Sequence, residues 1–255
     1  MKYSLYARAC STTVFFVGFY ILITGEAKCH WSESRGSGKS RHTVSFDGHV
    51  IYLNSKTYFF GYKGAPEVEI PAGTFSYNFA CELPPLLPET LAASKGSIDY
   101  KIEACLDIPW RFDKEVRVPI IVVRNDNLND TPELLMPMQF EDERSFCCFC
   151  ISEGTCKLNV KVPHRAYVLG ESISVMIECL NKSSVKIDSI LVKLKRYTNF
   201  TSSTPKIKTK VKSEVVLSSK AEGVKKNTSK GQQLMMQIPS VLNPSNGRYC
   251  SVVTV

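Results

Sequence analysis

Hydrophobic and polar residues alternate along most of the chain from about residue 19 onward, as in β-strands with one buried face. The run from Ile98 to Asp107 places its apolar side chains on one face and its acidic residues, Lys101 and Cys105 on the other. The inward set is Ile98, Tyr100, Ile102, Ala104 and Leu106. No window of a dozen residues keeps a helical period, so the sequence predicts an all-β protein.

Shorter runs repeat the alternation, and turn residues separate them. Gly170 to Cys179 and Ile190 to Lys195 point an apolar side chain inward at every second position. Leu83 to Pro88 contains three prolines, which predict a connection instead of a central strand. Ile70 to Thr74 predicts a turn before the alternating residues Phe75 to Phe79. Strands punctuated in this way are typical of immunoglobulin-like antiparallel β-sandwiches.

Chain length and charge predict two such domains in tandem. A chain of 255 residues fits two domains of ordinary size. Residues 1–150 carry a net charge of −3 and residues 151–255 carry +11, which indicates two different surfaces. Charged, Phe, Cys and Gly residues cluster within residues 141–154. We therefore expect one β-sandwich over residues 1–145 and a second over residues 151–255.

The segment from Gly36 to Ser40 resembles the end of a phosphate-binding P-loop, but its surroundings favour a loop. A P-loop needs a glycine five residues before the Gly of Gly-Lys-Ser, and it must open a helix. The position five before Gly38 is Glu33, whose carboxylate would repel phosphate, and residues 42–53 have the composition of strand and turn. The sequence predicts a mobile loop between two strands here, without a nucleotide.

Ten cysteines raise the questions of zinc, disulfides and lipid attachment. Four of them are grouped, at Cys147, Cys148, Cys150 and Cys156. A zinc site needs a second pair at Cys-x-x-Cys or His-x3-5-His spacing, and the chain has none. We therefore predict no metal site and no cofactor. Buried or half-buried free thiols in a reducing compartment are the preferred interpretation, and lipid attachment to the cluster is the weaker alternative.

The first 27 residues have the outline of a secretory signal peptide, with two basic residues before the apolar run from Val14 to Ile23. Four Asn-x-Ser/Thr sequons would suit secretion: Asn129, Asn181, Asn199 and Asn227. Against it, the apolar run fits a strand equally well, Glu26 disfavours cleavage, and the run is short for a bilayer. A secreted β-sandwich recognition module with a cleaved signal peptide remains the alternative function.

Several motifs, in order, resemble the α-arrestins, also called arrestin domain-containing proteins. The N-terminal set comprises Gly25-Glu26-Ala27-Lys28-Cys29-His30-Trp31-Ser32-Glu33, Leu83-Pro84-Pro85, Gly96 to Ala104 and Pro109 to Asp113. The C-terminal set comprises Glu143 to Cys150, Tyr167-Val168-Leu169-Gly170-Glu171 and Cys179 to Ser184. The match covers roughly residues 19–250. The family's first strands and the end of its C-terminal domain are expected to be missing, since residues 1–17 look unrelated to it.

The resemblance implies a non-enzymatic, cytoplasmic adaptor in the trafficking or endocytosis of membrane proteins. The implied partners are cytoplasmic tails of membrane proteins or trafficking proteins, with peripheral contact to an acidic membrane surface. The family's recruitment of WW domains does not carry over, because the chain has no Pro-Pro-x-Tyr motif. Few aromatic residues are interleaved with the lysines, so we expect no nucleic acid partner.

The best candidate for such contacts is Pro205 to Lys212. On a strand, its four lysines would stack along one face, and Ile207, Thr209 and Val211 would point inward. The lysines are Lys206, Lys208, Lys210 and Lys212. Four ammonium groups in a row attract acidic lipids or acidic and phosphorylated tails. The alternative is a solvated edge strand that its lysines protect from aggregation.

The sequence does not indicate an enzyme, because it lacks the Gly-x-Ser-x-Gly and His-Glu-x-x-His motifs of hydrolases and metalloproteases. We therefore predict no catalytic residues. Trp31, Trp110 and Phe112 are interpreted as packing residues. His30 is interpreted as structural, because no further metal ligand follows at a useful spacing.

Overall fold

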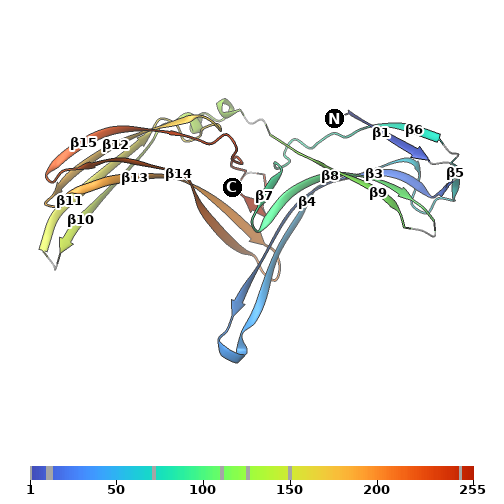
Figure 1. Ribbon diagram of the computed structural model, residues 1–255, viewed down its shortest axis with the longest axis horizontal. Helices are drawn as coiled ribbons and strands as arrows, with labels where there is room; N and C mark the ends of the chain where they lie inside the picture. Colours follow the sequence, from blue (N-terminus) through green and yellow to red (C-terminus); the bar gives the residue numbers. More distant parts are fainter. Residues whose placement is uncertain are drawn as a thin grey trace. The chain divides into compact units, whose positions relative to one another are not determined.

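The protein is all-β, with antiparallel sheets joined by loops and three short 3-10 helices among the described residues (Figure 1). The computed structural model describes residues 2–9, 14–70, 73–109, 112–124, 127–148, 151–246 and 249–255. Contacts divide the chain into two units. The first contains residues 1–124, 198–211 and 245–255, and the second contains residues 125–197 and 212–244. The predicted fold class is confirmed.

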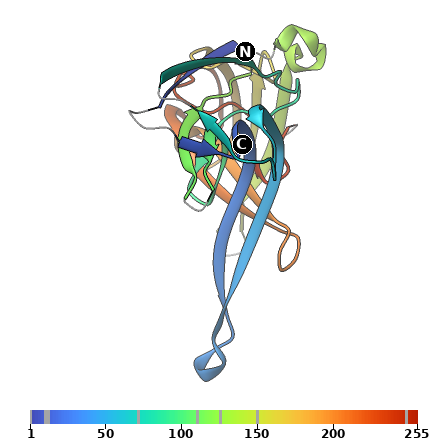
Figure 2. The same ribbon diagram turned by 90° about the vertical axis from the view of Figure 1, so that its right-hand side faces the viewer.

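The first unit is built on one five-stranded sheet of order β4-β3-β8-β7, with β9 also pairing with β8. Its elements are β1 (Lys2–Ala9), β2 (Val14–Phe16), β3 (Gly18–Arg35), η1 (Gly38–Ser40), β4 (His42–Gly61), β5 (Val68–Ile70), β6 (Gly73–Ala80), β7 (Leu91–Ala93), β8 (Gly96–Asp107), β9 (Lys114–Ile120) and β16 (Val253–Thr254). The β3–β4 hairpin is long and projects beyond the sheet in both ribbon views (Figures 1 and 2). Gly36 to Ser40 forms its tip, so the predicted loop between strands is confirmed.

The core of the first unit joins residues from three distant parts of the sequence. Trp31 and Phe46 stack with their ring centroids 5.3 Å apart, and both side chains are buried. Phe200 and Val253 join the same cluster and are 0 % exposed. Phe200 lies at the end of β13 and pairs with Val253 on β16. The first unit therefore depends on residues near the end of the chain.

The second unit contains a four-stranded sheet of order β10-β11-β12-β15 and the larger parts of β13 and β14. Its elements are η2 (Leu128–Asp130), η3 (Pro132–Leu135), β10 (Met138–Cys148), β11 (Ile151–Val162), β12 (Ser172–Ser183), β13 (Ile187–Ser202), β14 (Lys208–Val224) and β15 (Thr228–Gln237). Val175, Ile177, Ala221 and Met236 form its buried core.

The inward residues predicted from alternation are confirmed in β12 and in the first part of β8, where Ile98, Tyr100, Val175 and Ile177 are buried. The prediction is wrong near the end of β8, where Ala104 and Leu106 are only half-buried and Cys105, expected on the opposite face, is buried. Residues 141–154, where a boundary was expected, lie mostly in the β10–β11 hairpin of the second unit. Cross-strand ion pairs such as Lys157–Glu141, with Nζ and Oε1 2.7 Å apart, explain why this charged run forms strands.

The first residues of the chain also take part in pairing. Lys2–Ala9 forms β1 and pairs antiparallel with β6 over its whole length, and β2 pairs with β5. Among the described residues, no helix has the length and apolar character needed to cross a membrane.

Candidate charged surfaces of the first unit

The lysine segment follows a tight turn that is fastened to strand β4. The chain leaves β13, turns at residues 203–207 and enters β14 at Lys208. The backbone of Asp47 bonds to this turn, since its N–H donates to the Thr204 carbonyl at 2.8 Å and its carbonyl accepts from Ser203 N–H at 2.8 Å. Gly48 permits the approach, because a Cβ there would lie 2.4 Å from the Thr201 carbonyl oxygen.

The four lysines do not form one bare row. Lys206 precedes β14 and is exposed, Lys208 and Lys210 are half-buried, and Lys212 is exposed. The contact division falls between Val211 and Lys212, so Lys212 belongs to the second unit. Its Nζ lies 3.8 Å from Glu214 Oε2. Within the first unit the candidate site therefore comprises Lys206, Lys208 and Lys210.

The predicted inward direction of Ile207, Thr209 and Val211 is wrong. Ile207 is 81 % exposed, Val211 is 58 % exposed, and Thr209 is exposed as well. Lys208 and Lys210 on the opposite face are half-buried instead, and the β3–β4 hairpin contacts Lys208. Lys208 Nζ donates to Glu33 Oε2 at 2.5 Å and lies 5.1 Å from the centre of the Phe46 ring.

Glu33 is held as a carboxylate by this contact. The hydrogen bond from Lys208 lowers the pKa of Glu33 below its ordinary value, and bonds from Trp31 and the charge of Lys210 act in the same direction. Lys208 is thus an internal partner of the fold. Lys206 and Lys210 are the lysines left for an external anion.

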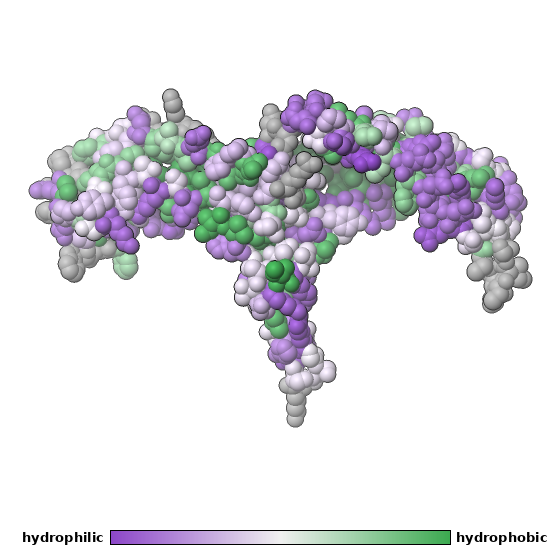
Figure 3. Space-filling view, turned by 180° about the vertical axis from the view of Figure 1, so that it is seen from behind, coloured by the Kyte–Doolittle hydropathy of each residue, from purple (hydrophilic) through white to green (hydrophobic). Residues whose placement is uncertain are grey.

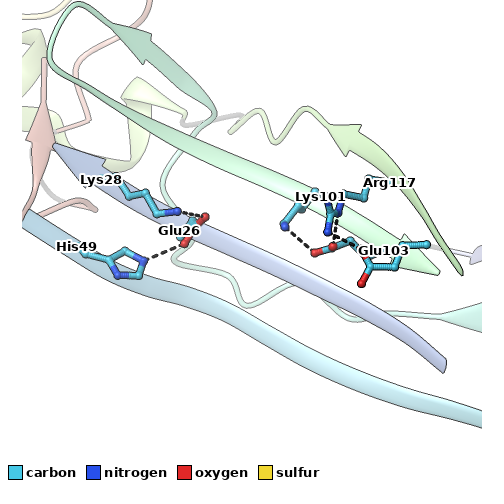
Figure 4. Close-up of polar contacts among 7 residues, drawn as sticks. Glu26, Lys28, His49, Lys101, Glu103 and Arg117 are labelled. Atoms are coloured by element: carbon cyan, nitrogen blue, oxygen red, sulfur yellow. Dashed lines mark hydrogen bonds and ion pairs between the residues drawn. The ribbon is translucent and has the colours of Figure 1, made fainter. Parts of the chain in front are cut away.

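A second charged surface covers the outer face of the β4-β3-β8 sheet, where Lys28 and His49 bond to Glu26 (Figure 4). Glu26 Oε1 accepts from Lys28 Nζ at 2.5 Å, and Oε2 lies 2.8 Å from Nε2 of His49. Burial alone would raise the pKa of Glu26, but the bonds from Lys28 and His49 outweigh burial and lower it.

Glu103 forms a similar cluster further along the same face (Figure 4). It is 8 % exposed, and its carboxylate accepts from Lys101 Nζ and Arg117 Nε at 2.5 Å each. Hydrogen bonds from Lys101 and Arg117 lower the pKa of Glu103. Arg117 also bonds to Glu115. Alternation placed Glu103 on the outer face, but it did not indicate that neighbouring cations would cover this glutamate.

An open groove of about 560 Å³ lies beside the Glu26 cluster. Its lining includes Lys28, His30, Asp47, His49 and Lys95. His30 Nδ1 lies 2.6 Å from Asp47 Oδ1, so the imidazole has a hydrogen-bond partner on the neighbouring strand. The β3–β4 hairpin that leads away from the groove shows mainly hydrophilic colours in the space-filling view (Figure 3).

The aromatic candidates have three different outcomes. Trp31 is 2 % exposed and packs in the core, as predicted. The prediction for Phe112 is wrong, because this residue lies in the connection between β8 and β9 and is 98 % exposed. Trp110 lies outside the described residues.

The described cysteines are free thiols, four buried and two half-buried. The side chains of Cys147, Cys148 and Cys150 lie outside the described residues. Cys156, which sequence spacing grouped with them, instead contacts Cys179 on the neighbouring strand, with the two Sγ atoms 3.6 Å apart. Within the described part of the chain, no three His, Cys, Asp or Glu side chains are grouped to hold a metal ion.

One predicted sequon is inaccessible in the folded chain. Asn181 is 0 % exposed, and its Nδ2 donates to the carbonyls of Val185 and Lys225 at 2.8 and 3.1 Å. Asn199 is half-buried and its Nδ2 donates to Thr254 Oγ1 at 3.1 Å. Asn129 and Asn227 are exposed.

Two protein-family models match the chain in tandem. The arrestin (or S-antigen) N-terminal domain matches residues 12–129, and the arrestin (or S-antigen) C-terminal domain matches residues 152–255.

Two of the three similar proteins described next are named for arrestin domains. The chain is 28 % identical to arrestin domain-containing protein 17 of Caenorhabditis elegans, over 91 % of this chain and 56 % of that protein. It is 31 % identical to arrestin domain-containing protein 4 of Mus musculus, over 66 % of this chain and 41 % of that protein. It is 26 % identical to thioredoxin-interacting protein of Homo sapiens, over 64 % of this chain and 41 % of that protein. The chain thus spans about half the length of these relatives.

Proposed function

Because the chain belongs to the arrestin family, we propose that it is a non-enzymatic adaptor of the α-arrestin type in membrane-protein trafficking or endocytosis. Its partners are cytoplasmic tails of membrane proteins or trafficking proteins. The observation that carries the proposal is the tandem match of both arrestin domains over most of the chain. Arrestin domains generally act as non-catalytic adaptors.

The lysine segment is the proposed contact for acidic groups on these partners. Lys206 and Lys210 supply positive charge on the first unit beside a turn that backbone bonds fix to β4. A fixed turn presents its charges without the entropy cost of ordering a loop. Acidic or phosphorylated tails and acidic lipid headgroups share the chemistry that recognises these lysines.

Reversal of the two external lysines tests this contact. Lys206→Glu and Lys210→Glu together should weaken binding to vesicles containing phosphatidylserine by at least about 30-fold, since each lost basic residue near an acidic surface costs about 1 kcal/mol and the new carboxylates add repulsion. The same double variant is measured against an acidic tail peptide, and a loss of binding to only one of the two ligands separates a lipid partner from a peptide partner. Lys208 is left unchanged because it bonds to Glu33.

The matched control reverses Lys63 and Lys114, two exposed lysines of the first unit, and changes the net charge equally. It should leave binding within about twofold of the original, because distant charges are screened at physiological salt. Equal losses in both variants would mean that net charge alone attracts the partner. Unchanged binding in the Lys206/Lys210 variant would reject the lysine segment.

The adaptor role also places the protein in the cytoplasm. The burial of Asn181 supports this placement, since a folded chain could not expose that sequon to glycosylation. Expression in animal cells should yield a chain that retains residues 1–27 and carries no glycan at Asn129 or Asn227. Peptide mapping by mass spectrometry measures both, and a cleaved or glycosylated product would favour the secreted alternative.

A further inference from the structure

Two cysteines of the second unit lie in contact with each other. Cys156 is on β11 and Cys179 is on β12, and their Sγ atoms are 3.6 Å apart. Cys179 is 2 % exposed, whereas Cys156 is half-buried. The proposed adaptor role makes no use of either thiol, and both lie outside the charged surfaces of the first unit.

The strand register explains this contact. Strands β11 and β12 pair Cys156 with Asn181 and Leu158 with Cys179, so the cysteines are diagonal neighbours on one face of the sheet. Diagonal neighbours are farther apart than directly opposed residues. A disulfide brings the two sulfurs to about 2.0 Å, so a bond between Cys156 and Cys179 requires side-chain rotation and a small strand shift. Such a bond is strained, and strained disulfides are reduced more easily than relaxed ones.

Hydrogen bonds hold the end of β12 beside the two thiols. Asn181 Nδ2 donates to the carbonyls of Val185 and Lys225, while its Oδ1 accepts from Ser183 Oγ at 2.6 Å. All these bonds lie within the second unit and are buried or partly buried. They fix the chain two residues beyond Cys179, so the contact between the thiols is a built feature of the sheet.

We propose that Cys156 and Cys179 form a reversible thiol–disulfide pair, oxidised by a low-molecular-weight disulfide such as oxidised glutathione. In the first step the Cys156 thiol loses its proton to solvent, and its sulfur attacks one sulfur of glutathione disulfide. The S–S bond of the reagent breaks, a mixed disulfide forms on Cys156, and one glutathione thiolate leaves and takes up a proton.

In the second step the Cys179 thiol loses its proton and its sulfur attacks Sγ of Cys156. The mixed disulfide breaks, the second glutathione leaves as a thiol, and the Cys156–Cys179 bond forms. The two cysteines together lose two electrons and two protons, and one glutathione disulfide becomes two glutathione molecules.

The order of the steps follows from the surroundings of the two thiols. Burial raises the pKa of Cys179 and the hydrogen-bond contact with Cys156 raises it further, to about 11, so little of this thiol is thiolate at neutral pH. Cys156 is the thiol that solvent reaches. Cys156 therefore reacts with glutathione disulfide first, and Cys179 resolves the mixed disulfide.

Peptide mapping of the full chain tests this assignment. The reduced protein is incubated with oxidised glutathione, the remaining thiols are alkylated, and the digest is analysed by mass spectrometry. We expect a peptide pair joined through Cys156 and Cys179. Excess reduced glutathione should restore both thiols. In the Cys179→Ser variant, one glutathionyl group should instead accumulate on Cys156, several-fold above its level in the original protein.

Cys81→Ser is the matched control, since Cys81 is a half-buried cysteine of the first unit, and it should leave the Cys156–Cys179 link unchanged. Separate modification of the two cysteines, or a link from either one to a different cysteine, would overturn the proposal. A link that survives excess reduced glutathione would overturn its reversibility. If Cys179→Ser does not fold, the map of the original protein still decides.

Discussion

Gly25 shows how a single residue permits the packing of the first unit. A Cβ at this position would lie 2.3 Å from the ring of Tyr100, which is 2 % exposed and whose hydroxyl donates to the Pro88 carbonyl at 2.7 Å. Burial and this hydrogen bond oppose a shift of the ring away from the added methyl group. Gly25→Ala should therefore lower the free energy of unfolding by about 1–3 kcal/mol.

The measurement is urea denaturation of both proteins, with Gly231→Ala as the control. Gly231 lies within β15, and no atom lies within 4 Å of its added Cβ. Its substitution should change stability by less than about 0.5 kcal/mol. A Gly25→Ala protein as stable as the control would show that the Tyr100 ring is not fixed.

Glu103 gives the folded state a dependence on pH. Hydrogen bonds from Lys101 and Arg117 lower the pKa of Glu103 in the folded state. The stability that the Glu103 carboxylate contributes is therefore fully present above the ordinary glutamate pKa. It is lost as the pH falls through the lowered pKa. Glu103→Gln should cost about 1–2 kcal/mol at pH 7. The difference in the free energy of unfolding between the original protein and Glu103→Gln should become smaller below about pH 4.

Urea denaturation midpoints of both proteins, measured from pH 7 to pH 3, report this difference in stability. Glu67→Gln is the control, because Glu67 is exposed. The control should stay near the original protein at every pH. A difference in stability that does not change with pH would mean that the charge of Glu103 does not stabilise the fold. Sequence alternation placed Lys101 and Glu103 on the same outer face of β8, but Arg117 comes to Glu103 through the pairing of β9 with β8, and the sequence does not specify this cross-strand register.

At the scale of elements, the turn between β13 and β14 depends on a close approach to β4. Because a Cβ at Gly48 would lie 2.4 Å from the Thr201 carbonyl oxygen, Gly48→Ala should loosen this turn. The amides of Asp47 and Thr204, which bond across the contact, should then exchange with deuterium at least tenfold faster. The amides of β12 should be unchanged, and equal acceleration there would indicate general unfolding.

The same contact explains which part of the lysine prediction failed. The alternation of Lys206 to Lys212 correctly indicated extended backbone from Lys208 onward, but it could not show which face is covered. A lysine stem is apolar along most of its length and its ammonium group can bond to a carboxylate. The hairpin supplies both partners, Phe46 and Glu33, so the lysine face is the half-buried one.

At the scale of the whole chain, the pattern of strands could be predicted from the sequence. The packing of two late segments of the chain in the first unit could not. Alternation depends on neighbouring residues, whereas the pairing of Phe200 with Val253 joins residues that are far apart in sequence. Residues 198–211 and 245–255 consequently pack with the first unit, although the C-terminal arrestin match includes them. The last residues of the chain are therefore expected to stabilise its first unit.

Two valine substitutions near the end of the chain test this dependence. Val253 is 0 % exposed in the first core and Val241 is 89 % exposed, so the same change removes the same atoms from opposite environments. Val253→Ala should cost about 2–3 kcal/mol and Val241→Ala less than about 0.5 kcal/mol. Tryptophan fluorescence reports on the first unit, because both tryptophans lie within residues 1–124. If Val253→Ala left that transition unchanged, the end of the chain would not contribute to the first core, and the first unit would be stable without it.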